Sequence, residues 1–417
     1  MRWAVVCGAF LWLPLSLVGA VAHAAAVRGT FTTWLAGSEE PRRGEAVAAR
    51  ALAEMVALQV ERLAVPMVGE ARVVLQGWGR GQLGDDTQDD TAADLNLLYV
   101  ETQNCVFSLR LGRQHVVSGV GRMLLLDGAQ GRLQIGHGIS LEAYGGAVVA
   151  RRLRFRDAGT ALGARVAKRF SWPGEIGLGY RRVARQGDVR FHDLGVDAMA
   201  YLDTWRLVAM AMVQPEALAL ADARVEATWS AFEALALNVH LERTVPHLLL
   251  PQDSILTVFG GVARDGAGMG GDWQPSPYEA YTLNGLVLMI DGKLGYEVQA
   301  GWRTYRDAGH RSLVGVDASR MAAEDMGYVQ GRVLSSLALS PLLRVGGDVR
   351  VYRYDEAINA TTTSLLGSLN AVFDLARELK IVLAGSAGST PLATRFVRGT
   401  LRLAYGYGTE FVAEMAP

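Results

Sequence analysis

Polar and apolar residues alternate one by one along many short segments of this chain, and this pattern limits the fold more than any other feature. In residues 342–354 the apolar positions are Leu343, Val345, Val349 and Val351, and the positions between them hold Arg344, Gly346, Asp348, Arg350 and Tyr352. Successive side chains of a β-strand point to opposite faces, so a period of two predicts a strand with one apolar and one polar face. The pattern recurs in residues 107–111, 131–135, 235–241 and 294–302.

The stretch 109–133 is rich in glycine and arginine, as a phosphate-binding loop would be. Such a loop needs the spacing G-x-G-x-x-G or G-x-x-x-x-G-K-[ST], which presents backbone N–H groups to the anion. Gly119 and Gly121 are followed by Leu124 where a third glycine would stand, and no Lys-Ser/Thr pair is present. The flanks instead alternate, so the stretch is predicted to be two strands joined by a loop.

The beginning of the chain is typical of a secretory signal peptide. A short basic start, Met1-Arg2-Trp3, precedes an apolar run, and the run ends in the small-x-small triplet Ala22-His23-Ala24. Cleavage after this triplet is expected. We therefore predict a signal peptide over residues 1–24 and one domain over residues 25–417, with a retained anchor helix as the alternative for the first segment.

Charge and cysteine content narrow the possible partners. Without Arg2 the chain has 40 basic residues against 42 acidic ones, which gives no sign of a nucleic-acid partner. Cys105 alone remains after processing, so no intramolecular disulfide can form.

The connections between the alternating segments favour a barrel over a soluble sandwich. No run of 18 uncharged apolar residues follows the signal segment. Short turns are predicted at residues 171–174, 290–293 and 339–341, and longer polar loops at residues 84–92, 244–277 and 306–325. Short turns, long loops and strands of about ten residues are typical of transmembrane β-barrels in bacterial outer membranes. We predict an all-β fold: a closed antiparallel transmembrane barrel of about 18–20 strands, with short periplasmic turns, longer extracellular loops and an outer-membrane location.

Two segments are ambiguous. Residues 45–63 are rich in alanine, leucine, glutamate and arginine and fit either a helix or a strand. Residues 255–262 are predicted to be a loop segment. Aromatic residues near predicted strand ends fit the interfacial girdles of membrane barrels: Trp34, Trp78, Trp205, Trp229, Trp302 and Tyr405.

Two strings resemble known barrel families. Leu109-Arg110-Leu111-Gly112-Arg113-Gln114, followed by Gly119, Arg122 and Leu126-Asp127-Gly128, resembles a motif of outer-membrane barrels of the alginate-export and porin-like type. Residues 248–260 are similar to a string found in outer-membrane barrels from myxobacteria and their relatives. The first resemblance implies export or diffusion through a lumen. The chain departs from the usual barrel because it ends in Ala416-Pro417, without a terminal aromatic residue.

If the apolar faces contact lipid, the polar faces line a lumen rich in arginine. The candidates are Arg110, Arg132, Arg165, Arg169, Arg303, Arg332, Arg344, Asp348, Arg350, Arg398 and Arg402. Such a lining favours anions, although ladders of arginine with acidic residues also stabilise barrel interiors.

Three functions stay open, and all have outer-membrane lipid as a partner. The first is a channel for small polar or anionic solutes, narrowed by loop 244–277. The second is a barrel for polysaccharide export with a periplasmic export partner, and the third is a non-conducting anchor of a trans-envelope complex.

No enzyme and no cofactor is expected, because the sequence contains neither G-x-S-x-G nor H-E-x-x-H. A possible Ca²⁺ site is the acidic run with Asp85, Asp86, Asp89 and Asp90, although a solvated loop is the simpler interpretation.

Overall fold

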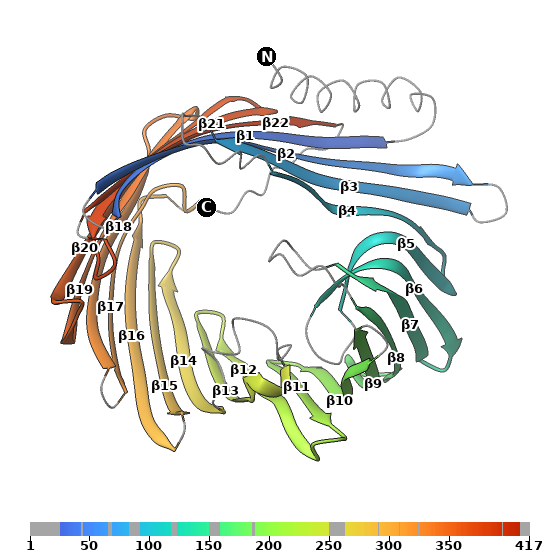
Figure 1. Cartoon of the computed structure of the whole chain (residues 1–417). Helices are drawn as coiled ribbons and strands as arrows, with labels where there is room; N and C mark the ends of the chain where they lie inside the picture. Colours follow the sequence, from blue (N-terminus) through green and yellow to red (C-terminus); the bar gives the residue numbers. More distant parts are fainter. Residues whose placement is uncertain are drawn as a thin grey trace.

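A computed structural model shows one closed β-barrel (Figure 1). The structure describes residues 26–42, 45–65, 69–82, 92–117, 123–149, 159–185, 188–249, 263–290, 292–307, 309–323, 326–393 and 395–408. Within these residues, 22 strands form a single sheet in which each strand pairs with its neighbours in the chain. The first and last strands, β1 (Ala26–Arg42) and β22 (Phe396–Tyr407), also pair and close the ring. The prediction of an all-β, closed antiparallel barrel is confirmed.

The strands form a continuous wall in chain order (Figure 1). The first half comprises β2 (Glu45–Val65), β3 (Gly69–Gln82), β4 (Ala92–Gln103), β5 (Phe107–Val116), β6 (Leu124–Gly136), β7 (Ile139–Val148), β8 (Thr160–Arg169), β9 (Gly174–Arg185), β10 (Asp188–Leu202) and β11 (Trp205–Gln214). The second half comprises β12 (Ala219–Phe232), β13 (Leu235–Thr244), β14 (Arg264–Ser276), β15 (Glu279–Ile290), β16 (Lys293–Tyr305), β17 (Leu313–Ala323), β18 (Met326–Ala338), β19 (Leu343–Ile358), β20 (Thr361–Ala376) and β21 (Leu379–Ser389). One short helix, α2 (Pro246–Leu249), follows β13.

The number of strands exceeds the predicted 18–20 because two predicted loops contain a strand each. β14 lies within residues 244–277 and β17 within residues 306–325. β14 has glycine at positions 266, 268 and 270, the middle three of its lumenal positions, so no polar side chains complete the alternation there. The neighbours β13 and β15 nevertheless supply hydrogen-bond partners along nearly its full length. Pairing with its neighbours therefore makes β14 a strand where its local sequence does not.

The ambiguous segment 45–63 is a strand throughout. It belongs to β2, which pairs with β1 from Ala26↔Glu61 to Arg42↔Glu45 and with β3 on its other side. The helical alternative is wrong, because two flanking strands override a moderate helix propensity. The predicted loop segment 255–262 and the predicted signal peptide 1–24 lie outside the described residues.

The two ends of the barrel differ in their connections. At one end, here called the turn end, the chain passes from an even-numbered strand to the next odd-numbered one, as through residues 137–138, 203–204 and 377–378. At the other, the loop end, lie the longest connections, including residues 149–159 and 245–263. The predicted turns 171–174 and 339–341 are at the turn end. The turn around Gly292 is also short, but it lies at the loop end, between β15 and β16.

The glycine of the first resemblance has a structural reason. Gly112 on β5 has a φ of 121°, and a Cβ atom added there would lie 2.2 Å from the carbonyl oxygen of Leu98 on β4. Only glycine tolerates both this backbone conformation and this close approach. The stretch 109–133 therefore forms β5, a connection and β6, as predicted, and Gly112 serves strand packing.

The connection between β16 and β17 is organised by one carboxylate. Asp307 accepts hydrogen bonds from the backbone N–H groups of Arg311, at 3.1 Å, and Ser312, at 3.0 Å. These bonds stabilise the ionised form of Asp307 and so lower its pKa below the ordinary value. The bond from the Arg311 backbone has the largest effect. The turn is thus held by a charged residue outside the strands.

Candidate functional site on the lumenal face

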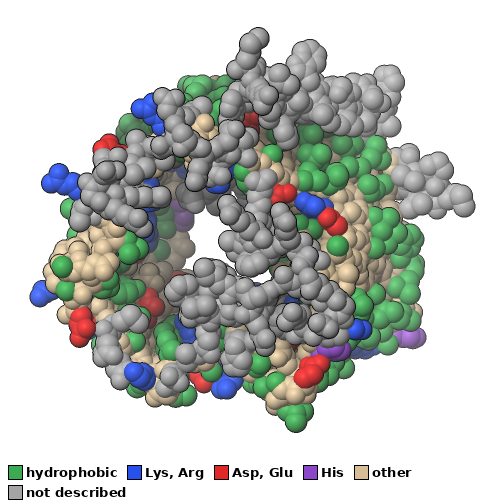
Figure 2. Space-filling model, viewed as in Figure 1, with side chains coloured by type: hydrophobic (Ala, Val, Ile, Leu, Met, Phe, Trp, Pro, Cys, Tyr) green, Lys and Arg blue, Asp and Glu red, His purple; other side chains and the backbone are tan. Residues whose placement is uncertain are grey.

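Strand register assigns each side chain to the outer or the lumenal face. On β19 the apolar side chains of Val349 and Val351 are 50% and 44% exposed on the outer wall. Arg344, Asp348 and Arg350 alternate with them and face the lumen. Figure 2 shows hydrophobic side chains over the outside of the wall and an opening in the middle of the view. The lumenal faces of the strands therefore form the candidate site.

A first lumenal cluster joins β16 to β20 through shared carboxylates. Arg303 lies 2.7 Å from Asp317, and Arg332 reaches both Asp348, at 2.6 Å, and Asp317, at 3.8 Å. Asp348 also binds Arg350 at 2.9 Å and accepts a hydrogen bond from Ser368 at 3.2 Å. Three guanidinium groups thus share two carboxylates, which leaves one positive charge uncompensated within this cluster.

A second cluster lies across β8, β9 and β10. Arg165 donates to Asp197 at 2.5 Å and to Glu175 at 2.8 Å, and Arg169 lies 3.4 Å from Glu175. Beside it, Arg181 and Asp193 form an ion pair at 2.5 Å, with side chains only 8% and 1% exposed. The predicted arginines here belong to an ion-pair ladder of the kind that stabilises a barrel interior.

The remaining predicted arginines have different surroundings. Arg110 lies 2.8 Å from Glu101 and stacks over the ring of Tyr99 at 4.7 Å. Arg398 and Arg402 on β22 lie over the rings of Phe396, at 5.0 Å, and Trp34, at 5.5 Å.

Arg132 and Arg344 are the least compensated of the predicted set. Neither has an ion-pair or hydrogen-bond partner in the part of the chain that the structure describes, although Arg132 lies within electrostatic range of Glu175. The structure thus gathers the predicted residues into separate clusters along the wall rather than into one site.

Several lumenal carboxylates were missed by the sequence analysis. Asp317 lies on β17, inside the segment predicted to be a loop. Glu101 lies on β4, outside the segments in which the alternating pattern was recognised. The alternation of Val314 and Val316 with Gly315 and Asp317 is the signal that could have found the first of these.

The long connection after β13 begins against the lumenal wall. Leu248 of α2 packs on the buried side chains of Met212 and Ala221, and its carbonyl oxygen accepts a hydrogen bond from the Gln214 side chain at 2.5 Å. The start of the predicted inward loop therefore lies against β11 and β12. The rest of that connection, including most of the string 248–260, lies outside the described residues.

The possible Ca²⁺ site is the acidic run of residues 85–90. Asp85, Asp86, Asp89 and Asp90 lie outside the described residues. Within the residues that the structure does describe, no three histidine, cysteine or acidic side chains are grouped as metal ligands.

The outer face carries an apolar belt with distinct borders. Aromatic side chains stack near the turn end, with Trp205 and Trp229 at 5.5 Å and Trp273 and Tyr281 at 5.2 Å between ring centroids. Near the loop end the outer face carries three ion pairs: Arg113–Asp127 at 2.7 Å, Arg243–Asp265 at 2.9 Å and Arg320–Asp355 at 2.6 Å.

The height of this belt matches a bilayer. Trp273 and Asp265 are eight positions apart on β14, about 27 Å along the strand and about 20 Å in height once the usual strand tilt is included. An apolar band of roughly 25 Å between such borders is the hallmark of a membrane barrel. The predicted girdle is only partly correct, because Trp34 faces the lumen beneath Arg402.

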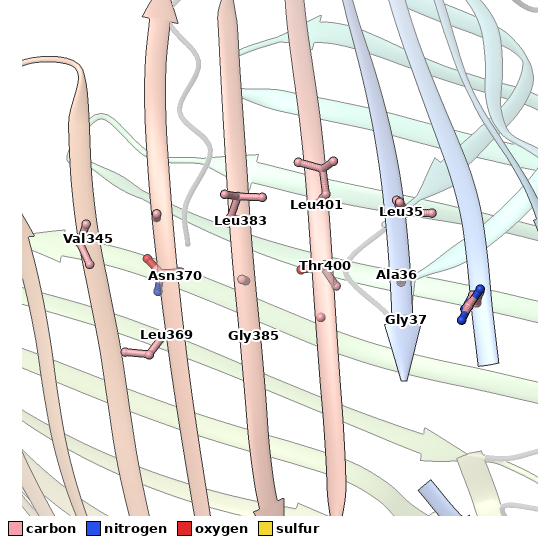
Figure 3. A pocket seen from close by; sticks show the side chains of 14 residues that line it. Leu35, Ala36, Gly37, Val345, Leu369, Asn370, Leu383, Gly385, Thr400 and Leu401 are labelled. Carbon is pink, nitrogen blue, oxygen red and sulfur yellow. The ribbon is translucent and has the colours of Figure 1, made fainter. Parts of the chain in front are cut away.

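A recess on the outer face belongs to this belt and not to the lumen. It has a volume of 640 Å³ and crosses β19 to β22, β1 and β2. Figure 3 shows the side chains of Leu35, Leu383 and Leu401 along it, beside Gly37 and Gly385, which leave the wall thin. Its lining is mostly apolar, as expected of a surface in contact with lipid.

Among the described residues no helix is long and apolar enough to cross a membrane.

The closed sheet, the apolar belt and the charged lumen together define a transmembrane β-barrel of the outer-membrane type. Solved structures with this fold include the translocation pore of the P pilus usher PapC, with 9% identity, a TM-score of 0.50, and coverage of 92% of this chain and 100% of that one. Another is the Pseudomonas aeruginosa protein OccK9 (OpdG), with 10% identity, a TM-score of 0.50, and coverage of 92% and 98%. No family model and no curated protein matches the sequence. The similarity confirms the barrel fold, and neither the alginate-export nor the myxobacterial family is confirmed.

Proposed function

We propose that this protein is an outer-membrane channel for small polar or anionic solutes, which pass through its lumen. The observation that carries the proposal is the excess of basic side chains on the lumenal face from β16 to β22. Asp317 and Asp348 compensate only part of the charge of Arg303, Arg332 and Arg350, and Arg344 is exposed without a described partner. Arginine binds anionic oxygens in fixed geometry and keeps its charge at all physiological pH values.

The opposite wall has the reverse balance. From β7 to β13 the lumenal acids are Glu142, Glu175, Asp193, Asp197, Asp222, Glu226 and Glu242. The lumenal arginines of the same strands are Arg165, Arg169, Arg181, Arg206 and Arg224. A base-rich wall that faces an acid-rich wall creates a field across the lumen, and this field orders polar solutes and favours anions along one side.

The placement of α2 supports a narrowed passage. Leu248 lies against Met212 on the lumenal wall, so the connection after β13 starts inward. In the proposed orientation, residues 1–24 act as a signal peptide, and the turn end faces the periplasm. The aromatic belt contacts outer-membrane lipid, and the chain has no catalytic role.

The test is single-channel conductance of the refolded mature protein in a planar bilayer under a salt gradient. We expect open steps with a preference for anions, and we expect Arg344→Gln and Arg350→Gln to weaken that preference. Arg353→Gln is the matched control, because Arg353 lies on the same strand but on the outer face. A silent bilayer from correctly folded protein would contradict the channel and leave polysaccharide export or the anchoring of an envelope complex.

A further inference from the structure

A polar pocket in the lumenal wall near the turn end has the features of a ligand site. It has a volume of 500 Å³ and lies where β4, β5, β6 and β7 meet. Its lining includes Glu101, Arg110, Gln130, Arg132 and Glu142, and the turn residue Cys105 lies at its edge. The surface of the pocket is mostly polar, so it differs from the lipid-facing recess of Figure 3.

An acid and a base in this pocket stand opposite each other without pairing. Arg132 on β6 and Glu142 on β7 are direct register partners, which places their Cβ atoms about 5 Å apart. They nevertheless form no ion pair, unlike Arg165 and Glu175 on the next strands. Glu142 accepts only the Gln130 amide, at 2.8 Å, from the residues described. Both charged ends therefore have free hydrogen-bonding capacity.

Two buried polar atoms of the pocket residues also lack partners. The Nε of Arg110 and the Oε1 of Gln130 are buried and make no hydrogen bond. A buried polar atom without a partner costs free energy in a folded protein, so such atoms mark places where a bound group is stabilising. One of these atoms is a donor and the other an acceptor.

We infer that this pocket binds a small amino-carboxylate, a molecule with one carboxylate and one ammonium group. The carboxylate binds the guanidinium of Arg132, which can engage both of its oxygens. The ammonium binds the Glu142 carboxylate, which accepts hydrogen bonds and has only the Gln130 amide as a described donor. The neighbouring Glu101 is already shared by Arg72 and Arg110, so it takes no part. This inference rests on the proposed channel, because the pocket opens to the lumen. It identifies the class of solute that the channel binds.

Cys105 provides a direct readout of occupancy. It is exposed at the edge of the pocket, and the only other cysteine, Cys7, lies in the predicted signal peptide. The experiment measures how fast an uncharged methanethiosulfonate modifies Cys105 in the refolded mature protein in detergent. The probes are three carboxylates with the same three-carbon chain, which differ in the group on C3: β-alanine, 3-hydroxypropanoate and propanoate.

We expect β-alanine to slow modification of Cys105, with half-protection at a concentration about 10-fold lower than for propanoate, as for one added charged hydrogen bond. Glu142→Gln should remove this difference, and Arg132→Gln should abolish protection by all three probes. Arg132→Lys keeps the charge and should retain part of the protection. Glu226→Gln, on the lumenal face of β12 outside the pocket, should change nothing.

Equal protection by β-alanine and propanoate, or a preference for β-alanine that survives Glu142→Gln, would overturn the inference. Stronger protection by 3-hydroxypropanoate than by β-alanine would overturn the ammonium assignment. The assay needs no conduction, so its failure is distinguishable from failure of the channel. Protection in a barrel that does not conduct contradicts only the channel, and conduction without protection contradicts only this site.

Discussion

Arg113 on β5 and Asp127 on β6 face each other on the outer surface of the barrel, with Nε and Oδ1 2.7 Å apart and a second bond of 2.8 Å between Nη2 and Oδ2. The same guanidinium donates to the carbonyl oxygen of Leu95 on β4 at 2.9 Å. Pairing between β4 and β5 stops at Leu98↔Arg113, although β4 begins at Ala92. Arg113 thus binds the backbone at the point where the two strands separate.

We predict that Arg113→Ala destabilises the barrel more than Asp127→Asn. The asparagine removes a half-exposed ion pair that contributes about 0.5–1 kcal/mol. The alanine also leaves the Leu95 carbonyl without its donor and should cost about 1–3 kcal/mol. Urea unfolding in lipid vesicles measures both values, and equal losses would show that the bond to Leu95 contributes nothing.

Asp193→Asn should be among the most destabilising single changes in the wall. It removes the charge of the carboxylate that binds the Arg181 guanidinium, whose side chain is only 8% exposed. Breaking such a buried pair costs about 3–5 kcal/mol, whereas replacing both residues by apolar ones of similar size is often neutral. The double variant Arg181→Met with Asp193→Leu should therefore be more stable than Asp193→Asn. The idea fails if the double variant is the less stable of the two.

Asp348→Asn should increase anion preference, in the direction opposite to Arg344→Gln. Asp348 compensates part of the charge of Arg332 and Arg350, and its loss leaves one more positive charge uncompensated at the lumenal face. Reversal potentials under a salt gradient measure the change. A shift toward cations in the Asp348→Asn protein would contradict the assignment of this cluster to the conducting face.

Tryptophan fluorescence should distinguish the two faces of the wall. In vesicles of brominated lipid, a variant that keeps only Trp229 should be strongly quenched, because that side chain is 38% exposed on the outer belt. A variant that keeps only Trp34 should be quenched weakly, since Trp34 lies beneath Arg402 on the lumenal side. Equal quenching would refute the assignment of faces.

The β16–β17 turn should loosen in acid. The pKa of Asp307 is lowered by hydrogen bonds from the backbone, so its stabilising contribution is present above the ordinary value near 3.8 and is lost as the pH falls through the lowered pKa. Hydrogen exchange of the Ser312 amide should accelerate below pH 3.8. Asp307→Asn, which cannot titrate, should show no such additional dependence on pH.

The alternation of residues allowed most of the wall to be predicted. Strands β5, β6, β16 and β19 follow from period-two patterns whose apolar members face lipid. β14 does not, because glycines occupy the middle of its lumenal face and only its pairing with β13 and β15 makes it a strand. The sequence of β2 fits a helix as well as a strand, and its pairing with β1 and β3 makes it a strand.

The sequence by itself determined the architecture and the membrane-facing surface. A period of two assigns each side chain to one of two faces, and a bilayer requires every strand edge to be paired, so closure follows. Only the tertiary structure decided which charges meet. Arg332 stands opposite Arg350 and reaches Asp348 diagonally, because register between strands sets side-chain neighbours and turns fix that register over long separations in the chain.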